Sequence, residues 1–189
     1  LADRQAGVPG SAVVAVLEGH RPVLVEVQAL VSPRPAGSGG FGTRTVTGLV
    51  PRRIDLILAV LAQRAQLDLS SADVFVSVAG GLTVREPAAD LAIAAAVVSS
   101  ATLRAVPGDV MMLGEVGLTG ELRSVPEPSR RISEAARLGF SRIVAPRDRS
   151  VRPAGGEVEW ARSARLQQVA TLGEAMHAMS LQDAGLRAV

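Results

Sequence analysis

The stretch Asp73–Ser100, DVFVSVAGGLTVREPAADLAIAAAVVSS, joins two contrasting patterns through a turn at Glu86-Pro87. Apolar and polar residues alternate over Asp73–Val78, which predicts a half-buried strand. Pro87–Ala101 is almost wholly apolar, which predicts a helix buried on all sides. A strand followed by such a helix predicts a sheet with helices packed against it, and the turn between them is the first place to look for functional groups.

Similar patterns on both sides of this stretch predict one α+β domain with helices packed on a mixed sheet. Ser11–Glu18 and Val23–Val31 are β-rich runs joined by a short turn, which is typical of a hairpin. The other predicted elements are strands at Thr43–Gly48, Val110–Gly114, Leu118–Leu122 and Arg142–Ala145 (the last of parallel type), helices at Arg52–Gln66 (after Pro51), Pro126–Leu138 and Leu172–Met179, and loops at Ser32–Gly42 and Arg147–Arg162.

Length and composition bound the domain count. The 189 residues are 48% hydrophobic and 20% charged, which indicates a single globular core. We divide the chain into an N-terminal linker over residues 1–10, a domain over residues 11–180 and a C-terminal tail over residues 181–189. The chain opens at Leu1 without methionine, so we expect it to be a domain excised from a longer protein.

Missing residue types exclude several kinds of site. The chain has no cysteine, tyrosine or lysine, so all 20 basic residues are arginine. This excludes thiolate nucleophiles, cysteine-bound zinc and a lysine base. The most apolar run, Leu91–Val98, is far too short to span a bilayer, and no signal peptide precedes it. We expect a soluble, cytoplasmic domain with no membrane partner and no cofactor or metal of its own.

A glycine-rich loop formally matches a dinucleotide fingerprint. Gly37–Gly42 reads G-x-G-x-x-G and follows a predicted strand. A pyrophosphate site needs a helix N-terminus directly after the loop, whereas Thr43–Gly48 has a strand pattern. We therefore predict a flexible connector rather than a nucleotide site.

The acidic residues and histidines give no clear catalytic pattern. Glu86, Asp90 and Glu115 could assemble into an acid/base or metal cluster, but carboxylates in a first helical turn also complement the helix dipole, and we favour this structural role. His20, in a predicted turn, and His177, on a helix, have no ligand or nucleophile at local spacing. We predict turn and surface roles for both histidines.

Arginines gather at two predicted helix starts. Arg52 and Arg53 follow Pro51, Arg130 and Arg131 follow Pro128, and Arg44 lies on a predicted strand. Guanidinium groups bind phosphate oxygens bidentately, so these five residues are candidate contacts to a nucleic-acid backbone. The alternative is a solvated, salt-bridged surface, and the sequence leaves both open. Few aromatic residues are available for stacking, which favours backbone contact over base readout.

Five ordered blocks resemble the C-terminal domain of the bacterial RadA (Sms) family. They are GVPGSAVVAVLEGHRPVLVEVQALVSP, RTVTGLVPRRIDLILAVLAQR, DVFVSVAGGLTVREPAADLAIAAAVVSS, GEVGLTGELRSVP and RISEAARLGFSRIVAP, which together cover most of the chain from Gly7 to Pro146. The resemblance implies a Lon-protease-like fold of the ribosomal protein S5 domain 2 type, in a cytoplasmic repair and recombination ATPase. It also implies self-assembly into a ring, which is a hexamer in this family, contact with single-stranded or branched DNA, and work alongside RecA.

The same resemblance implies that the parent protein has further domains, which lie outside this chain. The family's zinc finger and its ATPase motifs have no counterpart here, since a lysine-free chain cannot contain G-x-x-x-x-G-K-[ST]. ATP, magnesium and zinc are therefore implied only for the missing parts. Arg53 and Arg44 match family arginines, while Arg52 stands where asparagine is usual.

Lon proteases pair a serine at a helix start with a lysine, and both are replaced here. The serine position is Ala88, within Glu86-Pro87-Ala88-Ala89-Asp90, and the lysine position falls at or near Ser129. Arginine cannot replace the lysine as a base, because its pKa is too high. We expect a non-catalytic scaffold that assembles and contacts DNA. A pure oligomerisation module, or a hydrolase using Ser99, Ser100 or Ser129, are the alternatives.

Overall fold

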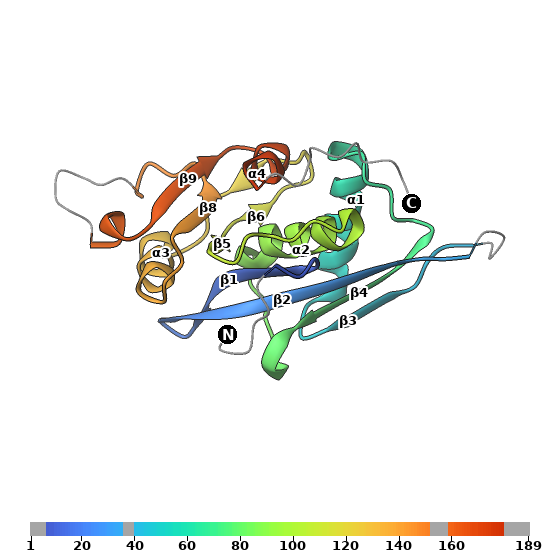
Figure 1. Cartoon of the computed structure of the whole chain (residues 1–189), viewed down its shortest axis with the longest axis horizontal. Helices are drawn as coiled ribbons and strands as arrows, with labels where there is room; N and C mark the ends of the chain where they lie inside the picture. Colours follow the sequence, from blue (N-terminus) through green and yellow to red (C-terminus); the bar gives the residue numbers. More distant parts are fainter. Residues whose placement is uncertain (1–6, 36–39, 152–158, 180–189) are drawn as a thin grey trace.

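A seven-stranded mixed sheet with helices packed on it forms the domain (Figure 1). A computed structural model describes residues 7–35, 40–151 and 159–179. The strand order is β3-β4-β2-β1-β5-β8-β9, and β6 and β7 form a separate two-stranded sheet. The predicted combination of helices with a mixed sheet is confirmed.

The elements follow the sequence patterns closely. The strands are β1 (Ser11–Glu18), β2 (Arg21–Pro33), β3 (Arg44–Thr47), β4 (Ala72–Val78), β5 (Val110–Met112), β6 (Glu115–Val116), β7 (Leu122–Arg123), β8 (Arg142–Pro146) and β9 (Arg165–Val169). The α-helices are α1 (Pro51–Arg64), α2 (Asp90–Thr102), α3 (Pro128–Arg137) and α4 (Leu172–Ala178), and three short 3-10 turns are η1 (Ala79–Gly81), η2 (Pro87–Ala89) and η3 (Glu159–Arg162).

Strand pairing confirms the predicted hairpin and the predicted parallel strand. β1 and β2 are antiparallel and joined at Gly19-His20, while β8 is parallel to both β5 and β9. Helix α2 lies against β1 and β2, and α1 packs on α2. Helix α3 contacts the same two strands, so the hairpin is the centre of the domain.

Two predictions between residues 115 and 169 were wrong. Leu118 is exposed in a turn that joins β6 to β7, so only the last residue of the predicted strand Leu118–Leu122 lies in a strand, at the start of β7. The glycines on either side, Gly117 and Gly120, close this turn through a backbone hydrogen bond of 3.0 Å. No helix or strand was predicted over the residues that form β9. The proposed tail at residues 181–189 lies outside the described residues, as do residues 1–6 of the proposed linker and residues 152–158 of a predicted loop.

The predicted buried helix is confirmed, with a later start. Pro87–Ala89 form the turn η2, and α2 proper begins at Asp90. All residues from Asp90 to Ser100 are buried, and the alanines Ala92, Ala94, Ala95 and Ala96 are fully so. None of the described helices is both long enough and apolar enough to cross a membrane.

The glycine-rich loop leads into a strand, as expected for a connector. Of its residues, 36–39 lie outside the described part, and β3 begins two residues after Gly42. A Cβ on Gly42 would lie 1.9 Å from the carbonyl oxygen of Ala72. Close backbone packing therefore accounts for this glycine without a ligand.

A side-chain link joins the starts of β5 and β8. Arg142 donates from Nε and Nη2 to the Asp109 carboxylate at 2.9 and 2.8 Å, and the Ser141 hydroxyl donates to the same group at 2.6 Å. These hydrogen bonds, with that from Arg142 the largest contribution, hold the pKa of Asp109 well below its usual range. A carboxyl with a depressed pKa stabilises the fold above its ordinary pKa and loses this contribution as the pH falls.

We expect Asp109→Asn to reduce the free energy of unfolding at pH 7, and to have no effect at strongly acidic pH. The loss at pH 7 should be below about 1 kcal/mol, because both side chains are nearly half exposed. The difference should shrink below about pH 4, the ordinary range of aspartate. Urea unfolding at pH 7, 4 and 2.5 measures it, with the exposed Asp55→Asn as control. A difference independent of pH would contradict the assignment.

Candidate functional site

The turn Glu86–Asp90 contains Ala88, the residue that the sequence resemblance sets at the serine position of Lon proteases. Ala88 is 1% exposed and has no side-chain oxygen. Its carbonyl accepts a hydrogen bond from Gly114 N–H at 3.1 Å, and Leu91 N–H donates to Gly114 O at 3.1 Å. These bonds fix the turn against the end of β5. The site is therefore rigid at its backbone and lacks an attacking group at this position.

Asp90, at one end of this turn, is held by Arg53 from the start of α1. Arg53 donates to both carboxylate oxygens, from Nε at 2.7 Å and also from Nη2, and Val116 N–H donates to Asp90 at 3.0 Å. Asp90 is 0% exposed. Burial raises the pKa of Asp90, and the hydrogen bonds from Arg53 and Val116 oppose that rise. The ion pair compensates a charge that would otherwise be costly to bury.

Glu86, at the other end, is held by Arg131 from α3. Arg131 donates from Nη1 and Nη2 to the two carboxylate oxygens at 2.8 and 2.6 Å. It also donates to the carbonyls of Ala15 and Pro126 at 2.6 and 2.9 Å, and Leu17 N–H donates to Glu86 at 2.7 Å. Arg131 is 0% exposed. Its hydrogen bonds therefore tie α3, β1 and the turn together.

We call these two ion pairs, Arg53–Asp90 and Glu86–Arg131, the arginine clamps. They correct two predictions at once. Arg131 was expected to contact phosphate, but it is wholly buried and bound to Glu86, whereas Arg53 is bound to Asp90 with its side chain 27% exposed and stays a predicted contact. Glu86 and Asp90 have the structural role that we favoured, although they act by ion pairing rather than by complementing a helix dipole.

The remaining predicted arginines differ in availability. Arg44 donates to the carbonyls of Leu69 and Ala72 at 2.8 and 2.6 Å, which ties β3 to the loop before β4. Arg52 is exposed and forms no ion pair with a described residue. Arg130 is 59% exposed and lies 3.4 Å from Glu127. Of these three arginines, Arg52 and Arg130 are the two that are exposed to solvent.

The structure adds Arg85, which sequence reasoning missed. It is exposed, immediately precedes Glu86 and pairs with no described acidic residue. Arg53 and Arg131 reach opposite ends of one turn, and Arg85 lies just before the end that Arg131 holds, beside the closed end of the β1–β2 hairpin. We call Arg52, Arg85 and Arg130 the surface arginines. No local motif marks Arg85, since its place depends on this tertiary arrangement.

The alternative catalytic groups are engaged in the fold or stand apart. Ser99 donates to Arg104 O at 2.5 Å and accepts from Gly10 N–H at 2.9 Å, and Ser100 accepts from Val31 N–H at 2.9 Å. Both serines therefore anchor the α2 end to the hairpin. Ser129 is exposed on α3. Within the described residues, no group of three acidic residues, histidines or cysteines is arranged to hold a metal ion.

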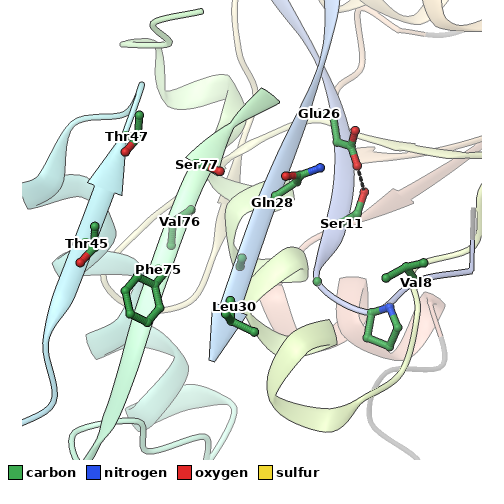
Figure 2. A pocket seen from close by; sticks show the side chains of 13 residues that line it. Val8, Ser11, Glu26, Gln28, Leu30, Thr45, Thr47, Phe75, Val76 and Ser77 are labelled. Carbon is green, nitrogen blue, oxygen red and sulfur yellow. Dashed lines mark hydrogen bonds between the residues drawn. The ribbon is translucent and has the colours of Figure 1, made fainter. Parts of the chain in front are cut away.

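A groove of about 600 Å³ lies across β3, β4, β2 and the segment before β1 (Figure 2). Strand register arranges its side chains in two rows: Thr45, Phe75 and Leu30 form one, and Thr47, Ser77, Gln28 and Ser11 form the other. Leu30 and Phe75 are 60% and 39% exposed. The one charged side chain among the lining residues, Glu26, accepts a hydrogen bond from Ser11 at 2.5 Å. A groove of this composition is better suited to contact with an uncharged protein surface than to binding a polyanion.

Comparisons with known proteins give one family model and a set of RadA relatives. The family model described as subunit ChlI of Mg-chelatase matches residues 52–149. DNA repair protein RadA of Halalkalibacterium halodurans is 47% identical over 146 residues, which are 77% of this chain and 31% of that protein. The Listeria monocytogenes protein of that name is 42% identical over 176 residues (93% and 37%), and the Bacillus subtilis one 44% over 161 residues (84% and 34%). The chain spans about a third of the length of these relatives.

Proposed function

Because this chain belongs to the RadA family, and through residues 52–149 to the ChlI family, we propose that it is a non-catalytic scaffold domain of a DNA repair and recombination ATPase. Its architecture would be the Lon-protease-like form of the ribosomal protein S5 domain 2 fold. In the parent, the domain would support a ring, such as a hexamer, and contact the DNA backbone. ATP, magnesium, zinc and work alongside RecA would belong to the parent in the cytoplasm.

The arginine clamps carry the non-catalytic part of this proposal. A hydrolase of this type needs a nucleophile and a base within hydrogen-bonding distance of each other. Ala88 offers no nucleophile, and the nearest carboxylates, Glu86 and Asp90, are each bound to an arginine. The donors around both carboxylates are therefore guanidinium and backbone N–H groups, and no described serine hydroxyl is hydrogen-bonded to either of them.

The surface arginines support DNA contact. Arg52 and Arg130 lie in the first turns of α1 and α3, where unpaired backbone N–H groups also favour anions, and Arg85 adds an exposed charge just before Glu86. Such contacts attract phosphate without reading sequence, and their affinity falls steeply with salt. The neutral groove across β3, β4 and β2 supports the assembly part, since an open sheet face with a row of exposed apolar side chains can pack against another protein surface. An assembly module without DNA contact is the alternative.

Replacing all three surface arginines by glutamine should weaken binding to a labelled single-stranded oligonucleotide at least tenfold at low salt. Each lost phosphate contact should also reduce the slope of log affinity against log salt by about 1, giving a total change of about 3. Fluorescence anisotropy across a salt series measures both quantities, and light scattering shows whether the mass of the protein in solution changes.

The matched control removes the same charge elsewhere, through Arg147→Gln, Arg149→Gln and Arg165→Gln, which are also exposed. It should affect binding much less. If both triple variants and the parent show equal DNA binding, the surface arginines do not make the contact. If the unmodified chain, assembled or not, binds no DNA at low salt, the assembly-only alternative holds.

A further inference from the structure

A second cavity, of about 430 Å³, lies between α3, the start of β2 and η3. Its polar lining consists of Ser129, Arg130, Ser133, Glu134 and Arg137 of α3, together with Ser163. Its apolar wall is formed by Trp160, Pro22 and Ala136. Arg130, one of the surface arginines, belongs to this lining, so the proposed DNA contact surface continues into the cavity.

Trp160, in this wall, has a buried hydrogen-bond donor without a partner. The residue is 6% exposed, and its indole N–H is the buried side-chain donor without a partner in the described part of the chain. Buried donors are satisfied in the great majority of native structures, so an orphaned one calls for an explanation. A ligand with an acceptor oxygen or nitrogen in the cavity would supply the partner.

The charges around the cavity favour an anion. Arg130 and Arg137 are 59% and 64% exposed, and they pair with nearby carboxylates, Glu127 just before α3 and Glu134 within it. The hydrogen bond from Arg137, with a smaller effect of Arg21, lowers the pKa of Glu134. Exposed pairs of this kind contribute little, so an incoming phosphate can replace Glu134 as the partner of Arg137.

We propose that this cavity binds a nucleotide, with the phosphate on Arg130 and Arg137 and the base against the wall formed by Trp160, Pro22 and Ala136. Guanidinium forks match phosphate oxygens, the serine hydroxyls supply further donors, and the cavity lies in the size range of small-ligand sites. The nucleotide is either free or one unit of a DNA strand. For the DNA source, the inference rests on the proposed function.

Trp160 also reports on the site, because it is the single tryptophan of a chain without tyrosine. Its emission should change saturably when the 189-residue chain is titrated with thymidine monophosphate or with a dodecamer of thymidylate. Inorganic phosphate should compete with both. A control titration with thymidine, which lacks the phosphate, should leave the emission unchanged at the same concentrations.

Two substitutions should change the affinity for thymidine monophosphate in opposite directions. Arg137→Gln removes a charged donor and should weaken binding roughly tenfold. Glu134→Gln removes the competing carboxylate and should tighten binding about two- to fivefold. Arg147→Gln is the matched control, because Arg147 is 69% exposed and paired with Glu174 but lies outside the cavity lining. Substitutions that act only by destabilising the fold would not change the affinity for thymidine monophosphate in opposite directions.

The outcomes separate this inference from the proposed function. Unchanged Trp160 emission with every probe up to 10 mM, or changes that Arg137→Gln and Glu134→Gln do not alter, would overturn the nucleotide site even if anisotropy shows that the oligonucleotide binds. Saturation by thymidine monophosphate with no oligonucleotide binding supports the site with a free nucleotide as its ligand, and counts against DNA contact. Saturation by both supports the site with a DNA strand as source.

Discussion

Arg131→Met should lower the free energy of unfolding by about 3–5 kcal/mol, the range found when one partner of a buried ion pair is removed. Arg131 is wholly buried and makes hydrogen bonds to Glu86, Ala15 O and Pro126 O. Methionine retains apolar volume but leaves the Glu86 carboxylate with only the hydrogen bond from Leu17 N–H, and removes the guanidinium donor from two carbonyls. Urea unfolding followed by Trp160 emission measures the loss.

The neighbouring residue provides the control for this experiment. Arg130→Met should change stability by less than about 0.5 kcal/mol, because its pair with Glu127 is exposed. Combining Arg131→Met with Glu86→Gln should cost less than the sum of the single losses, since the double variant leaves no uncompensated charge. Equal losses of unfolding free energy in Arg130→Met and Arg131→Met would show that the Glu86–Arg131 pair stabilises the fold no more than an exposed ion pair does.

Arg53→Met should be the second most damaging change, with a loss of about 3 kcal/mol at pH 7. It leaves the fully buried Asp90 carboxylate with only the hydrogen bond from Val116 N–H. The loss should shrink as the pH falls. A buried carboxyl whose pKa is raised in the folded state stabilises the fold at pH values below its ordinary pKa. This contribution is lost as the pH rises through the raised pKa. Removing Arg53 raises that pKa further, because Arg53 opposes the effect of burial.

The adjacent Arg52 again gives a matched control. Arg52→Met should leave stability within about 0.5 kcal/mol of the parent at every pH, since its side chain is exposed. Urea unfolding of both variants from pH 7 to pH 4 tests the sign. If the deficit of Arg53→Met grows or stays constant on acidification, Asp90 is not the group that the substitution leaves unpaired.

Local pattern predicted most of the fold because apolar periodicity was strong where elements are buried. The helix now called α2 and the strands β1, β2, β4 and β8 were all predicted close to their bounds. Strand β9 reads RLQQV, and its residues are mostly exposed, so it lacks the alternation that marks a strand. The wrong strand near Leu118 arose because leucines there suggested burial, while the glycines around them dictate a turn.

The candidate site was harder to predict, because its arginines are sorted by tertiary contacts. Each pair follows a proline at a helix start, and composition alone treats both members as equal. Helical phase contains a usable signal: Arg53 is four residues before the buried Ile57, and Arg131 is four before the buried Ala135. Phase could have separated the clamp members from Arg52 and Arg130. It could not have named their carboxylate partners, which lie 37 and 45 residues away along the chain.

The alanines of α2 set the thickness of the domain. Ala92, Ala94, Ala95 and Ala96 are all fully buried on a helix that touches the central hairpin and α1. Methyl groups there permit a narrow interlayer distance, and a larger side chain would have to push the layers apart. Substitution along this helix is thus restricted by volume as well as by polarity, and the domain has more freedom to diversify at its rim than through its middle.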